Sequence, residues 1–168
     1  MDNHEEIGQS WNLESDLRIA LITFLLELPG FRVLPQLFEG HGEGVINYKL
    51  AYADVYAYAN NVLYVFELKV KDGLDRGVGQ MLRYFHELEG GRRLLGVYPA
   101  CFYKWGWGKG YDKGIVDVKT VKFFLVAGDG KDSAVEETIK RFSLPFELIY
   151  FLPRGYPVLA RGGVFYEV

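Results

Sequence analysis

Cysteine is almost missing from this sequence of 168 residues, which contains only Cys101. A lone cysteine cannot form an intrachain disulfide, and it cannot supply the several thiolates of a zinc or iron–sulfur site. The three histidines, His4, His41 and His86, show no His-x-x-x-His or Cys/His spacing. The sequence therefore gives no support for a disulfide scaffold or a zinc protein.

Long apolar runs are also missing. The longest, 19–26, is interrupted by Thr23 and is well short of the roughly 20 residues needed to cross a bilayer. The acidic start, Met1 to Glu6, does not resemble a signal peptide. No Gly-x-x-x-x-Gly-Lys-Ser/Thr loop occurs, so nucleotide hydrolysis has no support. We expect a cytoplasmic protein that does not enter a membrane.

An excess of positive charge is the third absence, because the formal net charge is −3. Nucleic-acid binders often carry a strongly basic balance, so this counts against such a function. It does not exclude an enzyme that gathers acidic residues around a metal. Hydrophobic residues make up 49% and charged residues 24%, which is typical of a folded protein. The length predicts a single domain, 1–168.

Hydrophobic periodicity predicts an α/β fold. Helical spacing covers 13–28 and 75–89, each ended by glycine, and a third short helix is expected at 133–142. Asn60-Asn61 is typical of a hairpin turn, and Gly162-Gly163 suggests another in the tail, 157–168. Strands are expected at 31–38, 45–59, 62–70, 94–98, 121–126 and 146–152. This order predicts helices flanking a central mixed β-sheet.

The strand at 62–70 carries two charged residues, Glu67 and Lys69. Residues two apart on a strand point to the same face, so these side chains emerge together. The rest of the strand is apolar on both faces, which is typical of a central, covered strand. One interpretation is a simple ion pair at the edge of the sheet. The other is a site for chemistry, since burying charges without partners is costly.

Asp54 favours the second interpretation. It lies in the preceding strand, where aspartate is disfavoured, and it is as far from the Asn60-Asn61 turn as Glu67 within a residue. Two carboxylates brought that close repel unless a cation lies between them, and hard oxygen ligands select Mg²⁺ or Mn²⁺. Lys69 would then orient water or stabilise charge on a phosphate. The alternative is that Asp54 merely caps a bulge.

Ala53-Asp54, with Glu67-Leu68-Lys69-Val70 beginning thirteen positions after Asp54, resembles the core of the PD-(D/E)xK nucleases. These include restriction enzymes, archaeal Holliday-junction resolvases and the nuclease domain of RecB. Ala53 replaces the proline of the family pattern. The resemblance covers 12–100, leaves 101–168 as a C-terminal extension, and implies a restriction-endonuclease-like core. It also implies Mg²⁺- or Mn²⁺-dependent hydrolysis of phosphodiester bonds, with DNA favoured over RNA.

The resemblance extends to both predicted helices. An acidic residue on the first helix often completes the metal site in this family, and Glu14 matches it best, with Asp16 second. The second helix carries Gln80 and Tyr84, similar to the Gln-x-x-x-Tyr motif of the RecB-like branch. Residues four apart share a helical face. The iron–sulfur cluster of some RecB-like members is excluded, because four cysteines are needed.

The segment 104–114 interleaves lysines with aromatic residues among four glycines. Such a composition suits base stacking and phosphate contacts, although the tryptophans could equally fold back over the core. The residues predicted to bind nucleic acid are Lys104, Trp105, Trp107, Lys109 and Lys113. A rival hypothesis is a catalytically silent nuclease-like fold that binds nucleic acid or a protein. A homodimer is left open by the sequence.

Overall fold

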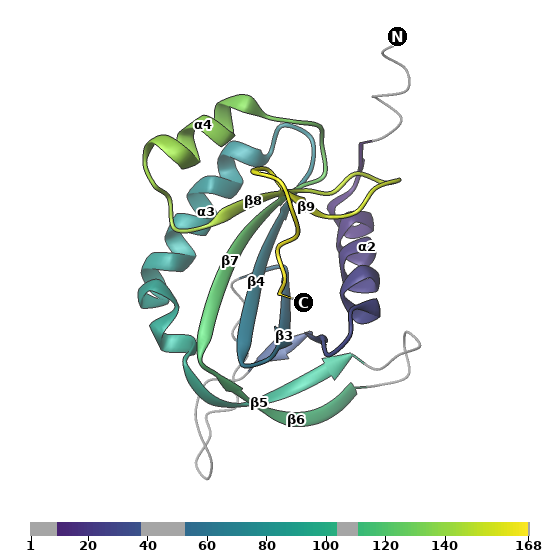
Figure 1. Cartoon of the computed structure of the whole chain (residues 1–168), viewed down its shortest axis with the longest axis vertical. Helices are drawn as coiled ribbons and strands as arrows, with labels where there is room; N and C mark the ends of the chain where they lie inside the picture. Colours follow the sequence, from purple (N-terminus) through teal and green to yellow (C-terminus); the bar gives the residue numbers. More distant parts are fainter. Residues whose placement is uncertain (1–9, 38–52, 104–110, 168) are drawn as a thin grey trace. The chain divides into compact units, whose positions relative to one another are not determined.

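The structure is a computed structural model and describes residues 10–37, 53–103 and 111–167. It is a mixed α/β protein with three α-helices in this part of the chain (Figure 1). The helices are α2 (Glu14–Glu27), α3 (Leu74–Glu87) and α4 (Ser133–Arg141), and a 3-10 helix, η1 (Glu89–Leu94), follows α3. The strands are β1 (Arg32–Leu34), β2 (Gln36–Leu37), β3 (Val55–Ala59), β4 (Val62–Lys69), β5 (Gly96–Tyr103), β6 (Tyr111–Val118), β7 (Thr120–Ala127), β8 (Glu147–Tyr150) and β9 (Val158–Leu159).

The strands form two sheets. One has six strands in the order β1-β3-β4-β7-β8-β9, and the other has three in the order β2-β5-β6. Strands β7 and β8 pair in parallel, whereas β1 pairs with β3, and β8 with β9, in antiparallel fashion. The central sheet is therefore mixed, as predicted. In the described part of the chain, no helix is both long and apolar enough to cross a bilayer.

Contacts divide the chain into two compact units, and each draws on segments that are distant in sequence. Unit 1 comprises Met1–Leu21, Phe66–Arg83 and Phe123–Val168. Unit 2 comprises Ile22–Val65 and Tyr84–Lys122. The single-domain assignment stays a prediction.

Unit 1 has an aromatic core. The Phe66 ring stacks on Phe124 with centroids 5.5 Å apart, and Phe165 meets Phe66 edge-on at 5.5 Å. All residues of β4 after Val62 are buried. The expectation of a covered strand, based on its apolar residues on both faces, is confirmed.

The connection from β7 through α4 to β8 is a β-α-β crossover between parallel strands. Asp132 caps α4, since its Oδ1 accepts a hydrogen bond of 3.0 Å from the Val135 amide. The Tyr150 hydroxyl of β8 donates to Glu136 Oε2 at 2.7 Å and accepts from the Asp132 amide at 2.9 Å. Burial raises the pKa of Tyr150, and the neighbouring Glu136 carboxylate raises it further. Tyr150 therefore ties the start of α4 to the sheet as a neutral phenol.

The tail does not form the predicted hairpin of its own. Strand β9 pairs instead with β8, with Leu159 opposite Ile149. Gly162 and Gly163 both have positive φ and close a tight turn, in which the Leu159 amide donates to the Gly163 carbonyl at 3.0 Å. The turn itself was predicted correctly. The strand partner was wrong because an edge of the central sheet was available to β9.

In unit 2, Asn60 and Asn61 connect β3 and β4 with φ of 50° and 66°. Two residues with positive φ between adjacent antiparallel strands make a type I′ turn, which Asn adopts readily. The predicted hairpin is confirmed. Strand β6 was not predicted, because its glycine- and lysine-rich start hides an alternating pattern in which Val116 and Val118 are buried and Ile115 is exposed.

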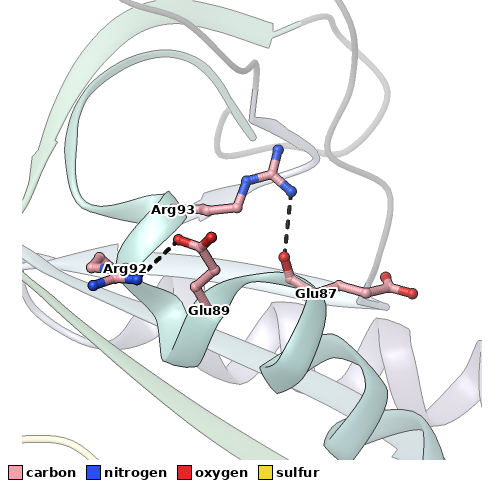
Figure 2. A network of polar contacts seen from close by, with 4 residues as sticks. All are labelled: Glu87, Glu89, Arg92 and Arg93. Carbon is pink, nitrogen blue, oxygen red and sulfur yellow. Dashed lines mark hydrogen bonds and ion pairs between the residues drawn. The ribbon is translucent and has the colours of Figure 1, made fainter.

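Arg92 and Arg93 follow α3, which ends before Gly90 and Gly91 with their positive φ. Figure 2 shows Arg92 directed at the Glu89 carboxylate, 3.4 Å away, and Arg93 at the main-chain carbonyl of Glu87, 3.3 Å away. A cation at the carboxyl end of a helix complements its unpaired carbonyls and dipole. In the structure Arg93 caps the carboxyl end of α3, whereas Arg92 pairs with the Glu89 side chain.

Candidate functional site

Glu67 and Lys69 lie side by side at the carboxyl end of β4. The Lys69 Nζ is 3.5 Å from Glu67 Oε1, as two-residue spacing on a strand predicts. Only 3% of Glu67 and 7% of Lys69 is exposed, and they are the buried charged residues among those described. Removing two charges from water costs several kcal/mol per ion before their attraction is counted.

Glu14 is the third member of this cluster. It lies in the first turn of α2, where the helix dipole favours an acidic side chain. Its Oε1 is 3.9 Å from the Lys69 Nζ, and 46% of the side chain is exposed. One ammonium group thus lies between two carboxylates, one buried and one open to solvent. Asp16, the second candidate on this helix, is exposed.

The segment before α2 is anchored to the end of β7. The Trp11 amide donates to the Gly128 carbonyl at 3.1 Å, and its indole donates to the Phe151 carbonyl at 2.8 Å. Gly128 in turn donates to the Lys69 carbonyl at 2.9 Å. A Cβ on Gly128 would lie within 3.1 Å of three side chains, including Trp11. These contacts hold the start of α2, and hence Glu14, beside the end of β4.

A cavity of about 250 Å³ opens beside Lys69. It forms where β4 and β7 both end, and Asp72 and Asp129 from the two following turns meet there, with the Asp72 amide donating to Asp129 Oδ2 at 3.3 Å. Its walls are Lys69, Val70, Asp72, Leu74, Ala127, Asp129, Gly130, Lys131 and Asp132. A larger cavity of about 600 Å³ lies along α4 and β8 and includes neither Lys69 nor Glu67. We therefore place the candidate site at the smaller one.

Asp72 and Asp129 were missed by the sequence analysis. Both are exposed or half-buried polar residues that follow a strand of the central sheet by a few positions. That position at the ends of neighbouring strands was the available signal, because ligands of α/β sheets often bind there.

The remaining predicted catalytic and metal-binding residues are Asp54, Gln80 and Tyr84. Asp54 belongs to unit 2, where it is half-buried and immediately precedes β3. Its approach to Glu67 stays a prediction. On α3, Gln80 of unit 1 is half-buried with its Oε1 enclosed and without a hydrogen-bond partner, and Tyr84 of unit 2 is 5% exposed. Neither side chain is a solvated surface group, but their direction toward Lys69 also stays a prediction.

Of the predicted nucleic-acid contacts, Lys113 is described and is exposed on β6. Lys104, Trp105, Trp107 and Lys109 lie outside the described residues. No group of three or more Asp, Glu, His or Cys close enough to hold a metal occurs within the described ranges. Unit 1 itself brings two carboxylates, Glu67 and Glu14, to one ammonium group.

Comparisons with protein-family models, with curated proteins and with solved structures returned no match for this chain.

Proposed function

We propose that this protein is a metal-dependent nuclease of the PD-(D/E)xK type, hydrolysing phosphodiester bonds of DNA on a restriction-endonuclease-like core. One observation carries the proposal: Glu67 and Lys69 are buried at the end of a central strand, with Glu14 3.9 Å from the same ammonium group. The order of these residues along the chain also fits the family pattern.

The burial of this ion pair supports a functional role, because a buried ion pair adds little net stability to a folded protein. Replacing a buried ion pair with apolar residues of similar volume is often neutral or stabilising. The Lys69–Glu67 distance of 3.5 Å is also long for a charge-assisted hydrogen bond. Charged groups that are costly to bury and clustered beside a cavity are typical of functional sites.

The hairpin supports Asp54 as the partner of Glu67. Each lies six positions from the two-residue turn. Residues equally distant from such a turn face each other on antiparallel strands, with Cβ atoms about 4.5–5.5 Å apart. If pairing continues one residue beyond Val55, the two carboxylates become cross-strand neighbours on one face. Their mutual repulsion would then be relieved by a cation.

The donor set fits Mg²⁺ or Mn²⁺. Both ions prefer carboxylate oxygens, and Mg²⁺ often uses only one or two carboxylates together with water and substrate phosphates. Asp54, Glu67 and Glu14 would hold the ion. When bound, it would neutralise phosphate charge and lower the pKa of a coordinated water.

Lys69 is the residue that acts on the substrate in this proposal. Its ammonium group donates toward the phosphate or holds the attacking water, in surroundings that strengthen such interactions by excluding solvent. Gln80 and Tyr84 would hold the other site residues in place or hold the cleaved strand. Lys113, with Lys104, Trp105, Trp107 and Lys109, would contact the nucleic acid outside the centre.

The experiment is cleavage of labelled single-stranded, duplex and branched DNA in the presence of Mn²⁺. We expect cutting by the wild-type protein and by Glu137→Gln, an exposed glutamate of α4 that serves as the control. We expect none by Glu67→Gln, which keeps the shape of the side chain but not its charge. Undiminished Mn²⁺-dependent cutting by Glu67→Gln would refute the assignment.

The catalytically silent alternative has one observation in its favour: Lys69 is within 4.0 Å of both Glu67 and Glu14, so the two carboxylate charges are partly compensated without a metal. Wild-type protein that binds DNA but does not cut it with either ion would favour this alternative.

A further inference from the structure

Helix α3 begins five residues after Lys69, the last residue of β4, and packs against the Lys69 side chain. The chain turns sharply after β4, because Lys71 and Asp72 both have positive φ and the Gly73 amide donates to the Val70 carbonyl at 3.3 Å. Helix α3 therefore starts immediately beside the strand that it follows. Non-glycine residues with positive φ are uncommon, and two in succession define a tight type I′ turn.

Two glycines of this helix region face the aliphatic part of Lys69. A Cβ on Gly77 would lie 2.8 Å from Lys69 Cγ and 2.7 Å from Leu125 Cδ1. A Cβ on Gly73 would lie 3.4 Å from Lys69 Cδ and 3.1 Å from the Val70 carbonyl oxygen. We call Gly73 and Gly77 the glycine notch; the Gly77 amide donates to the Gly73 carbonyl at 3.0 Å, so they are one helical turn apart.

We infer that Gly77 is a positioning residue for Lys69. Because Gly77 has no side chain, the aliphatic part of the Lys69 side chain lies in the space that a Cβ would fill. This placement directs the Lys69 ammonium group to Glu67 and Glu14. Gly77 is buried within α3, where glycine is intrinsically unfavourable. The close approach explains why a better helix former is not used there.

The same helix provides a matched control. Gly79 is exposed, two residues after Gly77, and a Cβ there would meet nothing within 4 Å. Gly79→Ala therefore carries the change in helix propensity without the contact to Lys69. Gly73→Ala, just before α3, would meet the Val70 carbonyl oxygen at 3.1 Å and Lys69 Cδ only at an ordinary contact distance of 3.4 Å.

The effect on Lys69 must be separated from simple overpacking against Leu125. Leu125→Val shortens the branched side chain that Gly77→Ala would meet, while it leaves the Lys69 stem in place. If Gly77 mattered only for packing, Gly77→Ala/Leu125→Val would recover both stability and activity. If Gly77 positions Lys69, stability recovers and the side chain of Lys69 stays displaced.

The test measures the side-chain Cγ and Cε resonances of Lys69 in metal-free protein, together with melting temperature and single-turnover cleavage. The cleavage measurement rests on the proposed function, but the resonances do not, so the two ideas fail separately. We expect Gly77→Ala/Leu125→Val to melt near the Leu125→Val temperature with shifted Lys69 resonances. Its kcat should fall about tenfold to a hundredfold with little change in KM, because small misplacements of a reacting group act mainly on the chemical step.

We expect Gly79→Ala to match the wild-type protein in all three measurements. If Gly77→Ala does not fold by itself, Gly77→Ala/Leu125→Val carries the test, because Leu125→Val removes the shortest contact that a Cβ on Gly77 would make. Lys69 resonances at their wild-type positions in a folded Gly77→Ala or Gly77→Ala/Leu125→Val protein would overturn the inference. Loss of cleavage in the wild-type protein would overturn the proposed function and leave the role of Gly77 to be decided by the resonances.

Discussion

Two of the ion pairs of unit 1 differ sharply in burial and in contact distance. Arg161 Nε and Glu147 Oε1 are 2.5 Å apart on β8 and its neighbouring turn, and their side chains are 69% and 42% exposed. Lys69 and Glu67 are 3.5 Å apart and almost fully buried. The pair with the shorter contact lies where ion pairs contribute little to stability, whereas the pair with the longer contact lies where charges are costly. The buried pair is not arranged for stability, which is why we assign it a function.

The largest expected effect comes from breaking the buried pair alone. Glu67→Ala leaves Lys69 buried with only the half-exposed Glu14, 3.9 Å away, as compensation. We expect the free energy of unfolding to fall by about 3–5 kcal/mol, as for other buried pairs that lose one partner. Denaturant unfolding at neutral pH measures this, with Glu147→Ala as the control that unfolds like the wild type. Equal changes in both variants would remove the distinction between the two pairs.

Replacing both buried charges sharpens the same contrast. The double variant Glu67→Met/Lys69→Met fills the site with flexible apolar side chains. We expect unfolding free energy equal to the wild-type value or higher by about 1–4 kcal/mol, together with complete loss of Mn²⁺-dependent cleavage. A double variant as unstable as Glu67→Ala would mean that the Glu67–Lys69 pair stabilises the fold.

A third prediction concerns a polar group of unit 1 that is partly buried but neutral. Burial raises the pKa of Tyr150 above its ordinary value of 10.0. A raised folded-state pKa means that the neutral phenol contributes stability below pH 10.0 and that this contribution is lost as the pH rises further. Unfolding free energy should therefore be flat up to about pH 10 and fall progressively as the pH rises above that value.

Tyr150→Phe should reduce that alkaline decline and lower stability by about 1 kcal/mol at neutral pH, since it removes the hydrogen bonds to Glu136 and Asp132. The same steep decline in Tyr150→Phe would assign it to another tyrosine.

The smallest expected effect is that of Arg161→Ala. The Arg161 side chain is mostly exposed, and salt screens ion pairs at exposed sites. We expect an unchanged melting temperature at physiological ionic strength and unchanged cleavage. A clear loss of stability in thermal melts, persisting in high salt, would show that exposure alone does not distinguish the two pairs.

The sequence predicted those features that depend on local periodicity. The two-residue spacing of Glu67 and Lys69, the helical stripe that became α3, and the Asn60-Asn61 turn each depend on residues that are close along the chain. The two sides of β4 could be recognised as covered because both are apolar.

Other features depend on residues that are distant along the chain. Gly77 looks like an unfavourable helix residue until Lys69 and Leu125 are placed against it. The pairing of β9 with β8 depended on which sheet edge was free, which no local pattern records. Strand β6 was missed because glycine and lysine at its start resemble a loop.

The most direct test of the central claim is calorimetric titration of Mn²⁺ into the wild-type protein, Glu67→Gln and Glu147→Gln. We expect one saturable binding event in the wild type and in Glu147→Gln, and its loss in Glu67→Gln, because Glu67, unlike Glu147, is assigned to the metal centre. Binding by Glu67→Gln that matches the wild type, or no binding by folded wild-type protein, would contradict the assignment of the buried pair to a metal-dependent site.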